Sequence, residues 1–223
     1  MIWRQLFGAD SSGLERIEQH LLDMLDADRR TLELAREGLL GHTDPDTLRQ
    51  QVSDSDYHVN ELVQQVRRQL VIHASTHGTA TDIPALLVTM SIVKDIERIG
   101  DYAKELLRIA RVAGPFPPGT PSHERLAAAC HQASGHLSEV RAALDTRDPD
   151  VTNRLLATIQ TFVDGLDEAL DTLLTTTPGE DSIAVALASQ YVKRIGAHLS
   201  NILTSIVLPV DQLDFYDEDQ PPQ

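Results

Sequence analysis

The sequence repeats itself, and this internal duplication limits the folds that the chain can adopt. The tripeptide Asp-Pro-Asp at residues 44–46 recurs at residues 148–150, and Arg-Ile-Gly at residues 98–100 recurs at residues 194–196. Between the two copies, six of the eight residues 114–121 are glycine or proline, a composition that ends helices and excludes a central strand. The chain of 223 residues is therefore predicted to contain two copies of one structural unit.

Each copy has the sequence pattern of three helices. In the first copy, Ser11 or Ser12 can cap a helix with apolar residues at helical spacing, and Gly41 is its stop signal. Asp44 and Pro45 form an N-cap followed by a first-turn proline, which opens the second helix. The other four helices are expected at 82–112, with Asp82 as the cap, and at 121–146, 149–174 and 180–208.

These helices predict an all-α protein made of two tandem three-helix bundles related by internal duplication. Aromatic residues are only 4% of the sequence, which favours helices over sheets. The predicted division is a first bundle at 1–113, a Pro/Gly-rich linker at 114–121, a second, degenerate bundle at 122–209 and an acidic tail at 210–223.

The charge of the chain argues against nucleic acid as a partner. It has 34 Asp and Glu against 19 Lys and Arg, a formal net charge of −15, so phosphates would be repelled. Its only cysteine, Cys130, excludes an internal disulfide, fits a reducing compartment and is expected to be a small buried side chain. There is no apolar run of about 18 residues and no apolar leader at the start. The expectation is a cytoplasmic protein that meets membranes only through partners.

Acidic residues interrupt the apolar seams of two neighbouring helices. Asp56 falls on the seam of the second helix with Asn60 one turn later, and Glu97 falls on a seam of the third with Asp101 one turn later. Carboxylates at buried positions are costly unless they are paired, protonated or bound to a cation. If the two helices pack antiparallel, these four residues converge, and oxygen-rich clusters suit Mg, Ca, Mn or Fe. The sequence therefore predicts a metal site at Asp56, Asn60, Glu97 and Asp101.

The same acidic residues have a plainer interpretation, in which they form salt bridges with Lys94, Arg98 and Lys104 on a solvated face. No nucleotide-binding, zinc-protease or serine-hydrolase signature occurs, so no catalytic residues are predicted. His198 is expected to be a satisfied polar residue rather than a ligand. Trp3 and Phe7 are expected to pack against the bundle or, alternatively, to dock on a membrane partner.

Residues 95–103, Asp-Ile-Glu-Arg-Ile-Gly-Asp-Tyr-Ala, resemble the signature helix of the PhoU-domain family, in which an acidic residue is followed four positions later by Asp. Asp56-x-x-Val59-Asn60 resembles the weaker motif of the preceding helix, and residues 191–198 resemble a repeat of the signature. The resemblance covers about residues 10–210. It implies two tandem three-helix bundles, often dimeric, with multinuclear iron or zinc clusters on the acidic motifs. Mg or Mn are the alternatives that the residues themselves suggest.

The resemblance also implies a function. PhoU-like proteins are regulators of phosphate uptake and phosphate signalling rather than enzymes, and they link a phosphate transporter to its sensor kinase at the inner face of the membrane. Others accompany sodium–phosphate cotransporters, which is the alternative role. Two further alternatives are a metal-dependent enzyme of unknown substrate, and a structural adaptor that uses its carboxylates only for salt bridges.

The second half departs from the family pattern. Lys193 and Ala197 replace the acidic pair of the signature, and Gln160 stands where the first half has Asp56. A charged lysine offers a metal no lone pair. Lys193 is therefore predicted to form an internal ion pair with Asp164 or Asp167, and metal is expected only on the first half.

Overall fold

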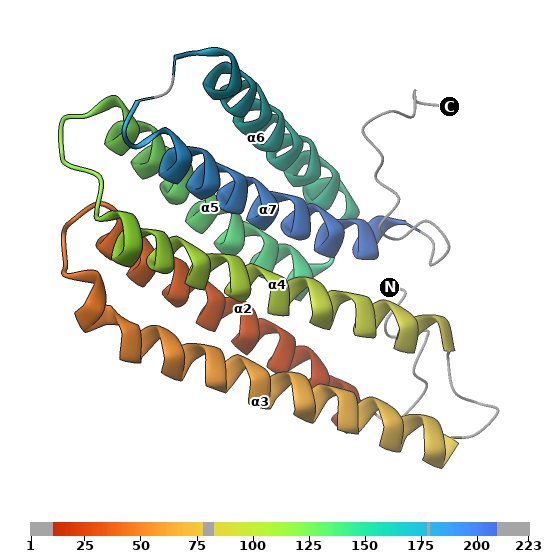
Figure 1. Cartoon of the computed structure of the whole chain (residues 1–223). Coiled ribbons are helices and arrows are strands. Elements are labelled where there is room, and N and C mark those ends of the chain that lie inside the picture. The colour runs from red at the N-terminus through yellow and green to blue at the C-terminus, as the bar shows by residue number, and fades with distance from the viewer. Residues whose placement is uncertain (1–10, 78–82, 178, 209–223) are drawn as a thin grey trace.

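A computed structural model describes residues 11–77, 83–177 and 179–208. These residues form six helices and no strand: α2 (Ser11–Leu39), α3 (Pro45–His77), α4 (Ile83–Ala113), α5 (Pro121–Thr146), α6 (Pro149–Thr175) and α7 (Ser182–Val207) (Figure 1). The predicted all-α fold and its six helices are confirmed. The predictions for Trp3, Phe7, the Asp82 cap and the tail at 210–223 lie outside the described residues.

The repeated tripeptide forms the same helix start in both halves. In α3, Asp44 Oδ1 accepts a hydrogen bond from the backbone N–H of Asp46 at 3.0 Å. In α6, Asp148 Oδ1 accepts from the N–H groups of Asp150 and Val151 at 2.9 and 3.2 Å. A side chain that satisfies the free N–H groups of the first turn stabilises a helix by about 1 kcal/mol. The sequence repeat is therefore a repeat of capping chemistry.

The Gly/Pro-rich segment between the halves packs against the end of α2. Gly41 ends that helix with φ +73°, a conformation that favours glycine, and lies next to Pro115. Phe116 is buried, and its N–H donates to the carbonyl of Leu39 at 2.9 Å. Thr120 then caps α5 by accepting from the N–H of His123. The connection is therefore part of the packed structure.

The two halves share one hydrophobic core. In the first half α2 packs against α3 and α4, and in the second half α7 packs against α5 and α6. The halves meet where α4 packs on α7 and α2 packs on α5, which leaves α3 and α6 as the outer helices (Figure 1). The buried apolar side chains form a single cluster across these contacts. The duplicated units are therefore joined through their inner helices.

A polar network lies at the junction of the halves. Asp95 of α4 is 8% exposed, and its Oδ1 lies 2.7 Å from Nδ1 of His198 and accepts from Nδ2 of Asn201 at 3.2 Å. The ring of Tyr102 stacks on His198 and on Tyr191, with centroid distances of 5.7 and 5.8 Å. The prediction that His198 is a satisfied polar residue is confirmed.

Cys130 lies on α5 and is fully buried. Burial disfavours the thiolate and raises the pKa of the thiol to about 12. The prediction that Cys130 is a small buried side chain is confirmed.

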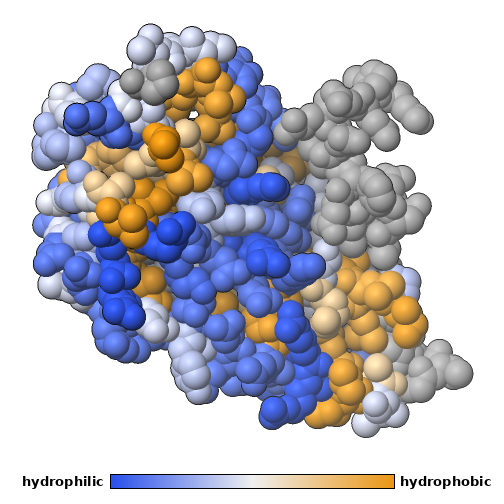
Figure 2. Space-filling view, viewed as in Figure 1, coloured by the Kyte–Doolittle hydropathy of each residue, from blue (hydrophilic) through white to orange (hydrophobic). Residues whose placement is uncertain are grey.

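Exposed apolar side chains gather at two places on the surface, near the α3–α4 junction and near the α6–α7 junction (Figure 2). Near the junction of α3 and α4 they are Val71, Ile72, Ile83 and Leu87, and near the junction of α6 and α7 they are Leu174, Ile183 and Leu187. In the described part of the chain, no helix is both long enough and apolar enough to cross a membrane.

Candidate functional site

Two of the four predicted site residues contact one lysine between α3 and α4, and a third bonds to one of them. The Nζ atom of Lys104 lies 2.6 Å from Oδ1 of Asp56 and 2.9 Å from Oδ1 of Asp101. Asn60 donates to the other oxygen of Asp56 at 3.4 Å. Burial alone would lower the pKa of Lys104, but the two carboxylates outweigh it and raise that pKa above its ordinary value. Lys104 is therefore a fixed positive charge within the acidic motif.

The fourth predicted residue, Glu97, has a different partner. Its carboxylate pairs with Arg67 of α3 at 3.2 Å, two turns beyond Asn60. Asp101 also pairs with Arg98 at 3.3 Å, so part of the salt-bridge interpretation is observed. Among the described residues, no group of three or more His, Cys, Asp or Glu side chains lies close enough to hold a metal in this arrangement. The metal site stays a prediction.

The degree of burial of the acidic motif differs from the expectation. Asp56 and Glu97 were expected at buried seam positions, but their side chains are 29% and 34% exposed. The physical reason is that α3 is an outer helix covered by α2 and α4 on one side only, so its seam opens to solvent. Among the residues of the first half that the structure describes, the buried carboxylates are instead Asp28 and Asp95.

Asp28 on α2 is a residue of this site that the sequence interpretation missed. It is 0% exposed, and neither of its carboxylate oxygens has a hydrogen-bond partner in the described structure. Burial raises the pKa of Asp28 well above its ordinary value, and the charges of Asp101 and Asp56 raise it further, while Lys104 acts in the opposite direction.

A signal for Asp28 is present in the sequence. The apolar stripe of α2 takes a step of seven positions from Leu25 to Leu32, and Asp28 occupies the position that the stripe skips. An acidic residue on the core-facing stripe of a helix is the same pattern that pointed to Asp56 on α3.

The repeated glycine gives close approach between helices in both halves. A Cβ atom at Gly100 would lie 2.5 Å from Oδ1 of Asp28, which is far inside contact distance. A Cβ atom at Gly196 would lie 2.8 Å from Cγ2 of Val163. The missing side chain of Gly100 therefore leaves room for a neighbouring group, and that group is the Asp28 carboxylate.

The ion pair predicted in the second half is present. Nζ of Lys193 lies 2.5 Å from Oδ1 of Asp167. The other candidate partner, Asp164, accepts instead from Nε2 of Gln160 at 2.8 Å. Both halves therefore place a lysine from the last helix of the unit against a carboxylate of the middle helix.

Replacement of Lys193 by alanine is expected to lower the free energy of unfolding by about 1 kcal/mol or less. The side chains of Lys193 and Asp167 are 21% and 37% exposed, so solvent screens the pair. Urea denaturation measures the loss, with the exposed Lys94→Ala as the matched control. A loss of about 3 kcal/mol or more would contradict this prediction, because only a desolvated pair behaves in that way.

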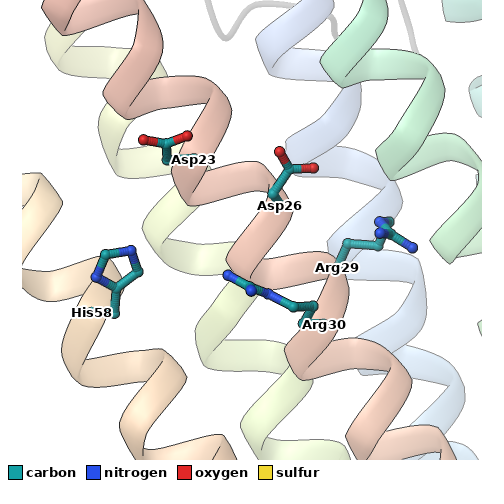
Figure 3. Close-up of a pocket in the computed structure, with 5 residues that line it drawn as sticks. All are labelled: Asp23, Asp26, Arg29, Arg30 and His58. Carbon is teal, nitrogen blue, oxygen red and sulfur yellow. The ribbon is translucent and has the colours of Figure 1, made fainter.

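An open pocket of about 470 Å³ lies along α2, facing α3. Figure 3 shows Asp23 and Arg30 of α2 on the side of His58 of α3, whereas Asp26 and Arg29 extend to the other side of α2. Asp26 pairs with Arg141 of α5 at 2.7 Å, and Arg29 pairs with Glu33 at 2.7 Å. The lining therefore combines both signs of charge, and two of its charges are already paired.

The fold and the acidic motif define a class of protein. It is an all-helical chain of two duplicated three-helix units, and the first unit has ion-paired carboxylates on α3 and α4. Residues 21–110 match the family model of the PhoU domain. The matched segment includes Asp28, Asp56, Gly100 and Asp101. This match confirms the resemblance to the PhoU-domain family seen in the signature helix.

Comparisons with known proteins extend the likeness over most of the chain. A protein of Synechocystis sp. named "Phosphate-specific transport system accessory protein PhoU homolog" is 25% identical over 198 residues, which are 85% of each chain. The crystal structure of PhoU from Pseudomonas aeruginosa matches with a TM-score of 0.74 at 22% identity, over 89% of this chain and 97% of that one. The phosphate transport system regulatory protein PhoU from Streptococcus pneumoniae matches with a TM-score of 0.66 at 14% identity, over 88% and 95%. At these identities the two structures show the shared fold.

Proposed function

We propose that this protein regulates phosphate uptake and phosphate-responsive signalling as an accessory protein of a phosphate transport system. The observation that carries the proposal is the PhoU domain at residues 21–110, which contains the acidic motif. The relative that is similar over 85% of the chain carries the name of a phosphate-specific transport accessory protein, which supports the same role.

The proposed mode of action is regulatory and not catalytic. The protein works in the cytoplasm, as a homodimer, through a phosphate transporter or a phosphate sensor kinase at the inner face of the membrane. The chemistry of the motif supports this: Asp56 and Asp101 are held by Lys104, and Glu97 is held by Arg67, so these carboxylates are bound in ion pairs. A general acid or base needs a carboxylate that is free to reach a substrate.

The proposal includes a metal on the acidic motif of the first half, with Asp56, Asn60, Glu97 and Asp101 as its ligands. Two observations fit such a group: the donors are all oxygens, and the nearby Asp28 carboxylate is buried without a partner. Oxygen donors favour iron, Mg or Mn over zinc, which prefers nitrogen and sulfur. A bound cation would supply positive charge between the helices and no reactive chemistry.

Disruption of the gene tests the regulatory role. Without the regulator, cells grown in ample phosphate are expected to keep taking up labelled phosphate and to keep phosphate-starvation genes active. Reintroduction of the wild-type chain should restore repression. Unchanged uptake and unchanged gene expression in the disrupted strain would overturn the proposal.

The same assay distinguishes the transport-system role from the alternative, in which the partner is a sodium–phosphate cotransporter. Uptake by the disrupted strain is measured with and without sodium in the medium. Excess uptake that persists without sodium supports the transport-system role, whereas excess uptake that requires sodium assigns the protein to the cotransporter.

A further inference from the structure

A group of exposed apolar side chains lies where α3 ends and α4 begins, and we refer to it as the first apolar patch. Its five residues are 39–65% exposed: Val71 and Ile72 of α3, and Ile83, Leu87 and Met90 of α4. Figure 2 shows apolar side chains gathered at this end of the molecule. Apolar side chains that gather on a surface mark a place of contact with another segment or molecule.

Positive charge flanks the first apolar patch. Arg68 lies one turn before Ile72 on α3, and Lys94 lies one turn after Met90 on α4. Both cations are exposed, and neither forms a salt bridge with another described residue. The patch therefore combines apolar side chains with two unpaired positive charges, in a chain whose net charge is −15.

The corresponding patch of the second half has the opposite charge around it. Its exposed apolar residues are Leu174 of α6 and Ile183 and Leu187 of α7. The charged residues closest to them in the sequence are all acidic: Asp171, Glu180 and Asp181. No Lys or Arg occurs from residue 155 to residue 192. An acidic segment would therefore be attracted to the first patch and repelled by the second.

The last helix ends beside the first apolar patch. α4 and α7 run antiparallel, because Asp95 contacts His198, whereas Tyr102, later in α4, stacks on Tyr191, earlier in α7. The end of α7 at Leu208 lies ten residues beyond His198, and the patch residues of α4 lie five to twelve residues before Asp95. Equal numbers of residues span equal lengths of helix, so the end of α7 lies level with the patch. Figure 1 shows the start of α4 and the end of α7 on the same side of the molecule.

Residues 209–223 follow α7 and have a composition that matches the first apolar patch. Leu208 has extended backbone, as expected before a proline, so the chain leaves the helix here. The segment has five acidic residues, at positions 211, 214, 217, 218 and 219, and no Lys or Arg. Among them stand the apolar side chains of Val210, Leu213, Phe215 and Tyr216. Acidic and apolar residues thus alternate in the segment that starts beside an apolar and basic surface.

The segment is long enough to reach the first apolar patch. Residues 209–216 span about 26 Å when fully extended. The patch begins on α4, which packs directly against α7, and continues on α3, which packs against α4. Packed helices lie about 8–10 Å apart. The segment can therefore reach the patch residues of both helices.

We propose that residues 210–219 dock on the first apolar patch, with their leucine and two aromatic side chains against its apolar residues and their acids near Arg68 and Lys94. The contact covers exposed apolar surface on α3 and α4 and balances two unpaired cations. The acidic segment thereby controls whether other proteins reach this end of the first unit. The inference is independent of the regulatory role, which the phosphate-uptake assay judges separately.

The reactivity of an introduced thiol measures whether the first apolar patch is covered. Leu87→Cys places a thiol in this patch, and Leu187→Cys places one in the second patch as the matched control. The native Cys130 is fully buried and has a pKa of about 12, so it reacts slowly in the folded chain. The rate of modification by N-ethylmaleimide, an uncharged reagent, is measured on the full chain. Addition of Leu213→Ser/Phe215→Ser is expected to raise this rate about fivefold or more in Leu87→Cys, and to leave it within about twofold in Leu187→Cys.

Arg68→Gln/Lys94→Gln tests the electrostatic part of the contact. Loss of two positive charges by itself slows the reaction of a nearby thiol, because a smaller fraction of the thiol is ionised. Faster modification of Leu87→Cys in this background, by about twofold or more, is therefore expected only where the acidic segment has been released. Circular dichroism spectra establish that each variant is folded.

A second measurement leaves the apolar residues of the patch unchanged. Chymotrypsin cleaves after aromatic residues, and mass spectrometry follows cleavage at Phe215 and Tyr216. A docked segment is expected to be cleaved more slowly in the wild type than in Arg68→Gln/Lys94→Gln, because the protease acts on the released form. Equal rates of cleavage in the two proteins would overturn the role of the two cations.

The remaining outcomes concern other occupants of the first apolar patch. A rate of modification of Leu87→Cys that does not change with Leu213→Ser/Phe215→Ser would overturn the docking of this segment. Protection of the thiol that instead rises with protein concentration would overturn it in favour of a second copy of the chain. Protection that is lost in Trp3→Ser/Phe7→Ser would overturn it in favour of the N-terminal residues.

Discussion

Replacement of Gly100 by alanine is expected to destabilise the protein by about 2–3 kcal/mol, although alanine is the better helix former. The reason is a direct overlap, since the new Cβ would lie 2.5 Å from Oδ1 of Asp28 and 3.4 Å from its Cγ. Asp28 is fully buried, so its carboxylate has little room to move away. Urea denaturation of the metal-free chain measures the loss.

The chain offers a matched control for this substitution. Gly135 also lies inside a helix, α5, but a Cβ there would meet no atom within 4 Å. Gly135→Ala is expected to stabilise the protein by about 0.5–1 kcal/mol, because alanine loses less backbone freedom on folding. Changes of opposite sign in the free energy of unfolding at the two glycines would show that contact with Asp28 decides the effect of the substitution.

A double variant identifies the contact itself. In an Asp28→Ala background the carboxylate is gone, and Gly100→Ala is expected to cost much less than in the wild type. Residues in contact give such non-additive effects, whereas independent sites add to within about 0.5 kcal/mol. Equal costs of Gly100→Ala in both backgrounds would contradict the packing of Asp28 against α4.

Replacement of Asp28 by asparagine is expected to stabilise the metal-free protein at pH 7 by about 1–3 kcal/mol. Burial, together with the charges of Asp101 and Asp56, raises the pKa of Asp28 in the folded protein above its value in the unfolded chain. Unfolding therefore releases a proton from Asp28 above about pH 4, and this group makes the wild type less stable as the pH rises.

The expected gain from Asp28→Asn therefore depends on pH. It is absent below about pH 4, where Asp28 is protonated in both states, and it grows as the pH rises through the folded pKa. Chemical denaturation from pH 4 to pH 8 in the presence of a chelator measures the difference. The control is Asp54→Asn, at an exposed position of α3, which is expected to follow the wild type at every pH. A gain that is constant with pH would exclude the charge of Asp28 as its cause.

The boundaries of the helices could be predicted from the sequence because they depend on local chemistry. Asp44 and Asp148 cap α3 and α6 by accepting from backbone N–H groups two or three positions later in the chain. Gly41 ends α2 through its own positive φ. The ion pair of Lys193 was also predictable, because the duplication aligns it with an acidic position of the first half. Spacing alone did not predict which of Asp164 and Asp167 pairs with Lys193, since both lie on the same helix.

The composition of the acidic site was decided by tertiary packing. Helical periodicity predicts which side chains share a face, and only with the added assumption of antiparallel packing did it bring Asp56 and Asn60 of α3 near Asp101 of α4. It does not predict the rotation of one helix against another, and this rotation pairs Glu97 with Arg67 and brings Asp28 against Gly100 from a third helix. The contact between Asp95 and His198 likewise joins residues 103 positions apart in the sequence.

The sequence by itself therefore determined the two units, their six helices and the location of the acidic motif, because these depend on capping, spacing and repetition along the chain. Only the tertiary structure decided which carboxylates are buried and which cations meet them. Burial and pairing depend on how close three helices approach, and the approach of α2 to α4 at Gly100 places an unpaired carboxylate beside the motif.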